Sequence, residues 1–190
     1  IPAPLSILEG VKKLMPGHYM VVQHGAVEIK KFYEFPYQES PPIRGLAEAK
    51  QQLITTLRKA VTDRLVADVP LGAFLSGGID SSVIVALASE EVKDLKTYSI
   101  GFKDNKYFDE THYAQLVADK FQTDHHVFSL TNDDLLAEVQ NVVDYIDEPF
   151  GDSSALPVFI LSKETRKHVT VALSGDGADE IFSGYNKHSA

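Results

Sequence analysis

The stretch VPLGAFLSGGIDSS, residues 69–82, joins an apolar run to a glycine-containing loop and then to a helical pattern. The apolar run ends at Leu75, the loop follows directly, and apolar residues return at helical spacing from Ile79. A short apolar run of this kind, closed by small residues and followed by a helix, is typical of a buried strand and the helix that crosses over it. The stretch therefore predicts a strand, a tight loop and a helix.

The same order of elements extends along most of the chain. Strand-like runs are expected at residues 69–75, 97–102, 125–130 and 169–173. Helical patterns are expected at residues 46–66, 79–91, 110–121, 133–146 and 156–168. Near-continuous apolar strands that alternate with helices predict an α/β fold, a doubly wound parallel sheet with helices on both faces. Ligands of such folds bind at the carboxyl ends of the strands.

The N-terminal part of the chain has a different pattern. Apolar and polar residues alternate over residues 17–35, with His24 and Gly25 where a hairpin would turn. Residues 35–44 carry three prolines in a polar stretch, which favours a linker. We therefore expect residues 1–43 to form a small β-hairpin and linker, and residues 44–190 to form the main domain.

Composition excludes several classes of function. The chain has 190 residues, an ordinary apolar content of 44% and no cysteine, so it has no disulfide framework and no cysteine nucleophile. Its net charge of −9 argues against a broad nucleic-acid surface. No apolar run approaches the ~18–20 residues of a membrane span. We expect neither nucleic acid nor membrane as a partner, and a cytoplasmic location.

The loop after the first core strand has the composition of a phosphate-binding loop. Gly77 and Gly78 permit close backbone approach, and the helix start offers N–H groups with partial positive charge. Asp80 would repel phosphates unless a hard cation such as Mg²⁺ lies between, and Ser76 and Ser81 add hydroxyl donors. The loop lacks the lysine of one common glycine-rich motif and the spacing of the other. The alternative is that Asp80 and the serines cap the helix while the glycines make a turn.

A second loop, LSGDGADE at residues 173–180, follows the last expected strand and resembles the first in design. In a doubly wound sheet the two loops can face each other. Asp80 and Asp179 could then share a Mg²⁺ ion, with Asp176 near the reacting phosphorus. The alternative is a polar turn in which Asp179 and Glu180 favour the start of a short helix.

Two further polar segments permit weaker interpretations. Residues 147–154 open a helix, so Ser153 or Ser154 could cap it, or the helix N-terminus could hold a substrate carboxylate. His125 and His126 are adjacent on an expected strand, where neighbouring side chains point to opposite faces. We therefore interpret them as strand-edge histidines and not as ligands of one metal ion.

Three of these segments, in this order, resemble motifs of the glutamine-hydrolysing asparagine synthetases. Residues 69–82 resemble the pyrophosphate-binding loop of the ATP-pyrophosphatase group, and residues 147–154 and 173–184 resemble later motifs of the same family. Residues 15–19 and the hairpin look like the end of the glutaminase domain and its connection. The resemblance covers about residues 11–185 and implies an adenine nucleotide alpha-hydrolase-like fold. It also implies that both ends are cut, including the C-terminal part of the synthetase domain.

The resemblance assigns expected roles to individual residues. Ser76, Gly78, Asp80 and Ser81 are expected to bind the β- and γ-phosphates and their Mg²⁺, and Leu75 and Gly77 belong to the same expected nucleotide site. Those expected against the rest of the nucleotide are Phe74 and Ile100 at the adenine, together with Ser174 and Gly175. Asp179 would be the second metal carboxylate. Asp176 holds the acidic position implicated in forming the adenylate, where some members have the longer Glu.

The implied reaction consumes aspartate, ATP and ammonia. The aspartate side-chain carboxylate attacks the α-phosphorus to give β-aspartyl-AMP and pyrophosphate, and ammonia then gives asparagine and AMP. Ammonia would come from the glutaminase domain of the same parent chain; a homodimer is left open, and the isolated piece is expected to be inactive. The alternatives are a related amidotransferase or β-lactam synthetase that acts on another carboxylate, or a nucleotide-binding module without catalysis.

Overall fold

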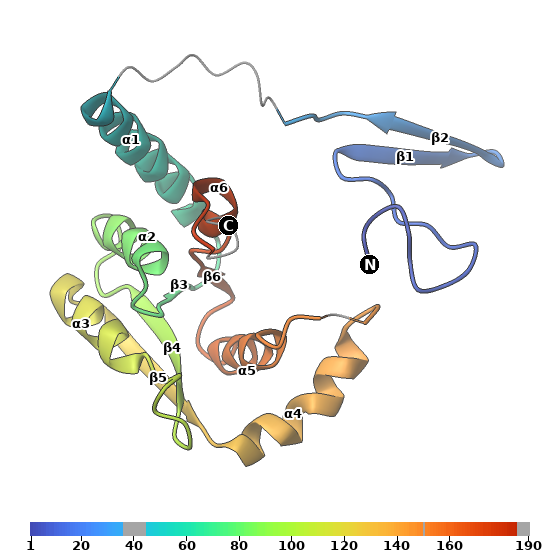
Figure 1. Ribbon diagram of the computed structural model, residues 1–190. Helices are drawn as coiled ribbons and strands as arrows, with labels where there is room; N and C mark the ends of the chain where they lie inside the picture. Colours follow the sequence, from blue (N-terminus) through green and yellow to red (C-terminus); the bar gives the residue numbers. More distant parts are fainter. Residues whose placement is uncertain (36–44, 150, 186–190) are drawn as a thin grey trace. The chain divides into compact units, whose positions relative to one another are not determined.

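The computed structural model describes residues 1–35, 45–149 and 151–185 (Figure 1). Contacts divide the chain into two compact units, residues 1–49 with 145–151 and residues 50–144 with 152–190. Most of the expected linker lies outside the described residues. The assignment of residues 1–43 and 44–190 to separate domains stays a prediction.

The small unit contains the expected β-hairpin. Strand β1 (His18–Gln23) pairs antiparallel with β2 (Ala26–Lys31), and Gln23 faces Ala26 across the turn. Both turn residues have positive φ, 51° at His24 and 82° at Gly25. Two consecutive positive φ values are the signature of the type I′ turn, whose twist matches that of paired strands. The hairpin prediction is confirmed.

The large unit is built on a parallel sheet of four strands. These are β3 (Leu71–Phe74), β4 (Lys96–Phe102), β5 (Asp124–Leu130) and β6 (Val171–Leu173). The described helices are α1 (Leu46–Leu65), α2 (Ile79–Ser89), α3 (Thr111–Phe121), α4 (Asn132–Tyr145), α5 (Ala155–Thr165) and α6 (Ala178–Phe182). Each element lies within a few residues of its predicted position.

The strand order in this sheet creates a switch point. The order is β5-β4-β3-β6, so the chain adds β4 and β5 on one side of β3 and then returns to place β6 on the other. Ala73 of β3 pairs with Leu173 of β6. Ligands of open α/β sheets bind beyond the carboxyl ends of the strands where the order reverses. The loops after β3 and β6 both lie at this point.

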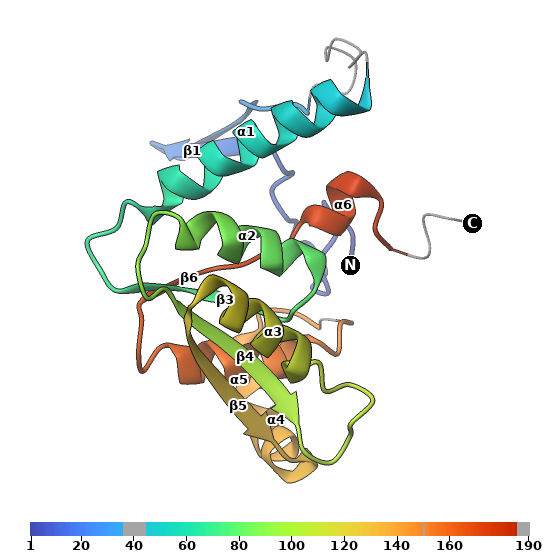
Figure 2. The ribbon, with the colours of Figure 1, turned by 90° about the vertical axis from the view of Figure 1, so that its left-hand side faces the viewer.

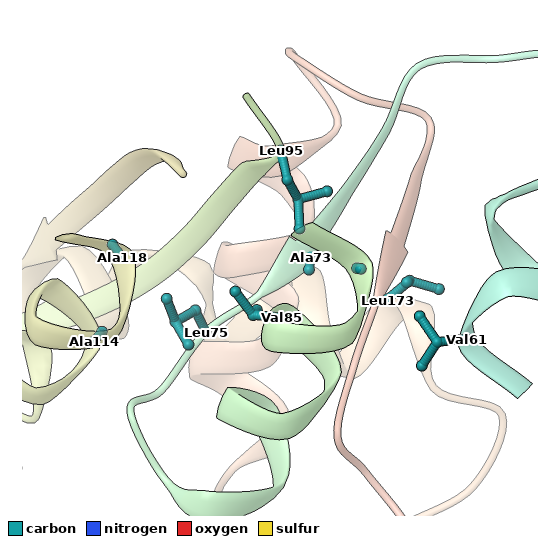
Figure 3. Close-up of a cluster of buried hydrophobic side chains, with 9 residues drawn as sticks. Val61, Ala73, Leu75, Val85, Leu95, Ala114, Ala118 and Leu173 are labelled. Carbon is teal, nitrogen blue, oxygen red and sulfur yellow. The ribbon is translucent and has the colours of Figure 1, made fainter. Parts of the chain in front are cut away.

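One face of the sheet packs against α1, α2 and α3 through a single apolar cluster (Figure 3). Its small residues, such as Ala88, Ala114 and Ala118, let helices approach closely. Leu75, Leu95 and Val85 are its largest fully buried members, and burial of such side chains stabilises the fold by about 1.5–3 kcal/mol each. The full cluster is Val61, Ala73, Leu75, Val85, Ala88, Leu95, Ala114, Ala118 and Leu173.

The other face is aromatic and lies toward α5. Tyr98 is fully buried, and its ring lies across Gly72, where an added Cβ would stand 2.8 Å from the Tyr98 Cε2 atom. The ring stacks on His126 at 5.4 Å and on His168, just beyond α5, at 5.9 Å between centroids. Figure 2 shows α3 and α5 on opposite sides of β4. Helices cover both faces, as the sequence predicts.

The strands differ from their predicted ranges mainly at their starts. Strand β3 begins at Leu71 and not at residue 69, because Pro70 has no N–H to offer a neighbouring strand. The Pro70 carbonyl instead accepts hydrogen bonds from Thr170 and Val171, at 2.9 and 3.3 Å. Within the described residues, no helix combines the length and apolar character that crossing a membrane requires.

Candidate functional site

The loop after β3 folds as a tight turn pressed against α3. Gly77 has φ +84°, and a Cβ added there would lie 2.5 Å from the Ala114 amide nitrogen and the Tyr113 carbonyl carbon. Only glycine fits a position with both positive φ and this backbone contact. Gly78 is the N-cap residue of α2. Because Gly78 has no side chain to cap the helix, the first N–H groups of α2 face the loop without a side-chain cap, an arrangement suited to an anion.

Hydroxyl groups hold this loop from within. The Ser76 amide donates to Ser81 Oγ at 3.2 Å, the two serine hydroxyls lie 3.0 Å apart, and the Gly78 amide donates to Ser76 Oγ at 3.2 Å. Ser82 Oγ donates to the Gly78 carbonyl at 2.6 Å. Among the described residues, the Asp80 carboxylate accepts no hydrogen bond. The serines therefore brace the turn, while Asp80 does not act as a helix cap.

The loop after β6 contacts the first loop directly. A Cβ added to Gly175 would stand 2.7 Å from the Ser81 amide nitrogen and 2.8 Å from the Asp80 carbonyl carbon. Ser174 Oγ donates to Asp176 Oδ2 at 3.0 Å, which fixes the orientation of that carboxylate. The helix α6 then begins after Gly177, whose φ is +94°. The predicted apposition of the two loops is present.

A cavity of about 540 Å³ opens between the two loops and the start of α5. Asp80 and Asp179 both line it, from opposite loops, and the Asp179 carboxylate also lies against the Cα of Gly184. The other residues around the cavity are Phe74, Ser76, Ser81, Asp152, Ser154, Val158, Leu161, Ser174, Gly175, Asp176, Gly177, Glu180 and Tyr185. Acidic side chains at or near the starts of α2, α5 and α6 therefore line this cavity.

A second, smaller cavity of about 170 Å³ adjoins the first. Phe74, Ser76 and Leu161 line both. The remainder of the small cavity is mainly apolar and aromatic, formed by Leu75, Tyr98, Ser99, Ile100, Phe102, Phe108, Glu110, Thr111 and Ala114. The apolar lining of the small cavity suits a flat apolar ring. The polar lining of the larger cavity beside it suits a charged group.

The expected site residues take different positions in this arrangement. Phe74 and Ile100 line the small cavity, and Ser76, Asp80, Ser81, Ser174, Gly175, Asp176 and Asp179 line the large one. Leu75 is 1% exposed and belongs to the core, and it also lines the small cavity, so its assignment to a nucleotide stays a prediction. Within the described residues, Gly77 and Gly78 line neither cavity and shape the turn through their backbone. Their assignment to a nucleotide stays a prediction.

The donor chemistry at the two loops is compatible with a magnesium ion. The described residues contain no group of three or more His, Cys, Asp or Glu side chains placed to hold a metal. Asp80 and Asp179 are a pair, and Mg²⁺ is commonly held by one or two carboxylates together with substrate phosphates and water. The residues present therefore fit an ion that arrives with its nucleotide and not one bound by protein alone.

Four polar residues around the large cavity, Asp152, Ser154, Glu180 and Tyr185, were not among the predicted site residues. Asp152 accepts a hydrogen bond from the Ser154 amide at 2.9 Å, which lowers the pKa of Asp152. Tyr185 donates to Glu180 Oε1 at 2.6 Å, and this bond raises the pKa of Tyr185 to about 12. Ser154 occupies the N-cap position of α5 but makes no capping bond with its side chain. All four lie in or beside segments that the sequence marks as polar, but only the packing of α5 and α6 brings them together.

Comparison with known proteins places the chain in a family. The family model described as asparagine synthase matches residues 52–190. The chain belongs to the asparagine synthase family. The matched region of this family member contains both loops and every residue that lines the two cavities.

Individual relatives resemble the chain over nearly its whole length. It is 40% identical to the putative asparagine synthetase [glutamine-hydrolyzing] 2 of Methanocaldococcus jannaschii, over 99% of the chain and 36% of that protein. It is 35% identical to the asparagine synthetase [glutamine-hydrolyzing] 1 of Bacillus subtilis, over 98% of the chain and 29% of that protein. The chain thus spans about a third of the length of the curated relatives it matches.

Among solved structures, the chain is similar to an NH3-dependent NAD synthetase from Campylobacter jejuni. The TM-score is 0.47 at 13% sequence identity, covering 72% of this chain and 60% of that one.

Proposed function

We propose that this chain is the ATP-binding part of a glutamine-dependent asparagine synthetase. The observation that carries the proposal is the contact between the two glycine-containing loops: Gly175 packs on residues 80–81, and Asp80 and Asp179 line one cavity. Family membership and the names of the relatives support amide synthesis as the reaction. The two adjoining cavities support a nucleotide, with its base in the apolar cavity and its phosphates in the polar one.

The residues divide the work of binding. The N-terminal amides of α2, braced by Ser76 and Ser81, would bind the terminal phosphates of ATP. Asp80 and Asp179 would hold Mg²⁺, which neutralises phosphate charge when bound. The apolar wall at Phe74 and Ile100 would exclude water from the adenine ring. Since phosphoryl chemistry depends mainly on positioning and charge stabilisation, no protein nucleophile is needed.

The proposed reaction has two bond-forming steps. In the first, an oxygen of the aspartate side-chain carboxylate attacks the α-phosphorus, and the bond to the bridging oxygen of pyrophosphate breaks. In the second, ammonia attacks the acyl carbon of β-aspartyl-AMP, loses a proton, and expels AMP. Asp176, which accepts a hydrogen bond from Ser174 and lines the same cavity, would orient groups near the α-phosphorus. Ammonia would come from glutamine, hydrolysed by a glutaminase domain of the parent protein.

Calorimetry with the chain tests the binding step. We expect Mg-ATP to bind, and Asp80→Asn to weaken Mg-ATP by about tenfold or more while AMP binding changes little, because AMP lacks the β- and γ-phosphates whose charge the ion would neutralise. The matched control is Asp68→Asn, since Asp68 is exposed and precedes β3 at the opposite end of the strand. Folded wild-type chain that does not bind Mg-ATP would refute the proposal.

Isotope transfer tests the chemical step in the full-length protein. Aspartate labelled with ¹⁸O in its side-chain carboxylate should deliver one labelled oxygen to the phosphate of AMP, because that oxygen stays on phosphorus when ammonia displaces it. Glutamate and unrelated carboxylic acids serve as competing substrates. Label in AMP from another acid, but not from aspartate, would favour the related amidotransferase or β-lactam synthetase reading.

A further inference from the structure

The Leu75 carbonyl lies where β3 leaves the sheet and becomes the first loop. The Leu75 amide donates to the Tyr98 carbonyl at 2.9 Å, which continues the pairing of β3 with β4 by one residue. The Leu75 carbonyl then accepts a hydrogen bond from Ser99 Oγ of β4. Leu75 is 1% exposed and Ser99 is 4% exposed, so water has little access to replace this hydroxyl. A side chain thus completes the strand pairing directly before Ser76.

His125 of β5 holds the Ser99 hydroxyl in this orientation. Its Nε2 atom lies 3.3 Å from Ser99 Oγ, and its Nδ1 atom lies 2.9 Å from Thr97 Oγ1. Because the one hydroxyl hydrogen of Ser99 goes to the Leu75 carbonyl, His125 Nε2 must carry the hydrogen and donate it to Ser99. Nδ1 then accepts from Thr97, and Thr97 accepts from Thr123 at 2.9 Å.

These contacts form a relay of hydrogen bonds, all donated in the same direction, from Thr123 to the first loop. It runs from Thr123 through Thr97, His125 and Ser99 to the Leu75 carbonyl, across β5, β4 and β3. His126, the next residue, stacks on Tyr98 on the opposite face of the sheet and takes no part. The two histidines do lie on opposite faces, as adjacent strand residues should.

We propose that His125, acting through Ser99, is a positioning residue that fixes the backbone of residues 75–78 for binding of a nucleoside triphosphate. A buried carbonyl that loses its donor moves to find another, and here it can move only by displacing the loop that follows it. The loop binds the β- and γ-phosphates, so the displacement weakens a triphosphate more than a monophosphate. This inference rests on the proposed function, because it concerns the same ATP site.

The test compares ATP and AMP binding by calorimetry in four variants of the full chain. His125→Ala should weaken Mg-ATP by about tenfold and AMP by less than about twofold, because it removes one buried hydrogen bond from the relay. Ser99→Ala, at a residue that also lines the small cavity, should weaken Mg-ATP more than it weakens AMP. His125→Gln should recover most of the ATP affinity, since its amide N–H can reach the position of Nε2 and donate to Ser99. His126→Ala is the matched control and should leave the ratio of ATP to AMP affinity unchanged.

Circular dichroism and a thermal melt first establish that each variant is folded. If His125→Ala does not fold, Ser99→Ala removes a single oxygen and carries the same comparison. A folded Ser99→Ala or His125→Ala variant with wild-type ATP affinity overturns the inference but leaves the proposed function standing. Equal losses for ATP and AMP, or the same loss in His126→Ala, also overturn it, because they indicate general damage. Wild-type chain that binds no ATP overturns both the inference and the proposed function.

Discussion

Gly175 of the loop after β6 lies directly on Ser81 of helix α2, with no room for a side chain between them. A Cβ on Gly175 would stand 2.7 Å from the Ser81 amide nitrogen, well inside van der Waals contact, and its neighbours there are mostly backbone atoms that cannot turn aside. The Ser81 hydroxyl in turn contacts Ser76 of the first loop. A shift of the loop after β6 would therefore move Ser81, and through Ser81 the loop after β3.

Replacing Gly175 tests this contact. We expect Gly175→Ala to push the two loops apart, to weaken Mg-ATP binding by at least tenfold, and to lower the free energy of unfolding by about 1–3 kcal/mol, as overpacking does. Calorimetry and urea unfolding measure the two effects. Gly45→Ala is the control, because a Cβ at Gly45 meets nothing within 4 Å. Unchanged ATP affinity in Gly175→Ala would mean that the loops can separate without consequence.

The pair Asp80 and Asp179 can be tested by a double-mutant cycle. If both carboxylates hold one magnesium ion, removal of the second after the first should cost little, since the ion is already lost. We therefore expect Asp80→Asn and Asp179→Asn each to weaken Mg-ATP by tenfold or more, and the double variant to be far less impaired than the product of the two factors. Strictly multiplicative effects in calorimetry would indicate that the carboxylates act separately.

The stability of the fold should depend on pH through His125. Burial lowers the pKa of His125 below its ordinary 6.5 and His126 adds to this effect, while a hydrogen bond with the Thr97 backbone and the nearby Asp119 oppose it. Between the lowered pKa and 6.5, the unfolded chain binds more protons than the folded chain, so acidification favours unfolding. The stabilisation from neutral His125 is complete above 6.5 and is lost as the pH falls below that value.

Comparison with His125→Gln isolates this contribution from that of the carboxylates. Urea unfolding of the wild type and the variant from pH 8 to pH 5 should show that the unfolding free energy of the wild type falls relative to that of the variant as the pH drops below 6.5. His126→Gln serves as the control on the opposite face. A difference that is constant over the whole range would show that His125 does not titrate differently in the two states.

Tyr98 provides a test in which the substitution is expected to keep or raise the stability of the fold. Its hydroxyl is buried and has no hydrogen-bond partner among the described residues, so Tyr98→Phe should remove an unsatisfied polar atom and leave the ring stacking intact. We expect the free energy of unfolding to stay the same or to rise by about 1 kcal/mol. Thermal and urea unfolding measure it, with Ser99→Ala as the contrasting case that leaves a buried carbonyl unpaired. A clear loss of stability in Tyr98→Phe would reveal a partner for the hydroxyl.

Sequence periodicity was sufficient to predict the elements of this fold, because the features that form them are local. The pattern around residues 69–82 indicates a strand, a turn and a helix without reference to the rest of the chain. The carboxyl ends of parallel strands share one edge, so the apposition of the two loops could also be anticipated. The partner strand of β6 could not be predicted, because nothing local in residues 171–173 specifies pairing with β3 instead of with β5.

The hydrogen-bond relay from Thr123 to Leu75 could not be predicted from the sequence for the same reason. His125 and Ser99 are 26 residues apart, and their contact depends on the register of β4 against β5. The sequence identified the histidine pair only as unsuited to one metal. Asp152, Glu180 and Tyr185 line the large cavity through the placement of α5 and α6, which periodicity does not determine.

The backbone packed around Gly77 limits which substitutions this site can accept during evolution. Its missing Cβ would meet the backbone nitrogen of Ala114 and backbone carbon of Tyr113, atoms that every residue type carries. A second substitution at position 113 or 114 therefore cannot act as a suppressor, since it would leave those atoms in place. At Gly101, by contrast, the nearest atom to an added Cβ is Thr111 Cγ2, at 2.9 Å, which the change Thr111→Ser would remove. A substitution at Gly101 can be accommodated by a second substitution at Thr111. A substitution at Gly77 can be accommodated only if helix α3 moves as a whole.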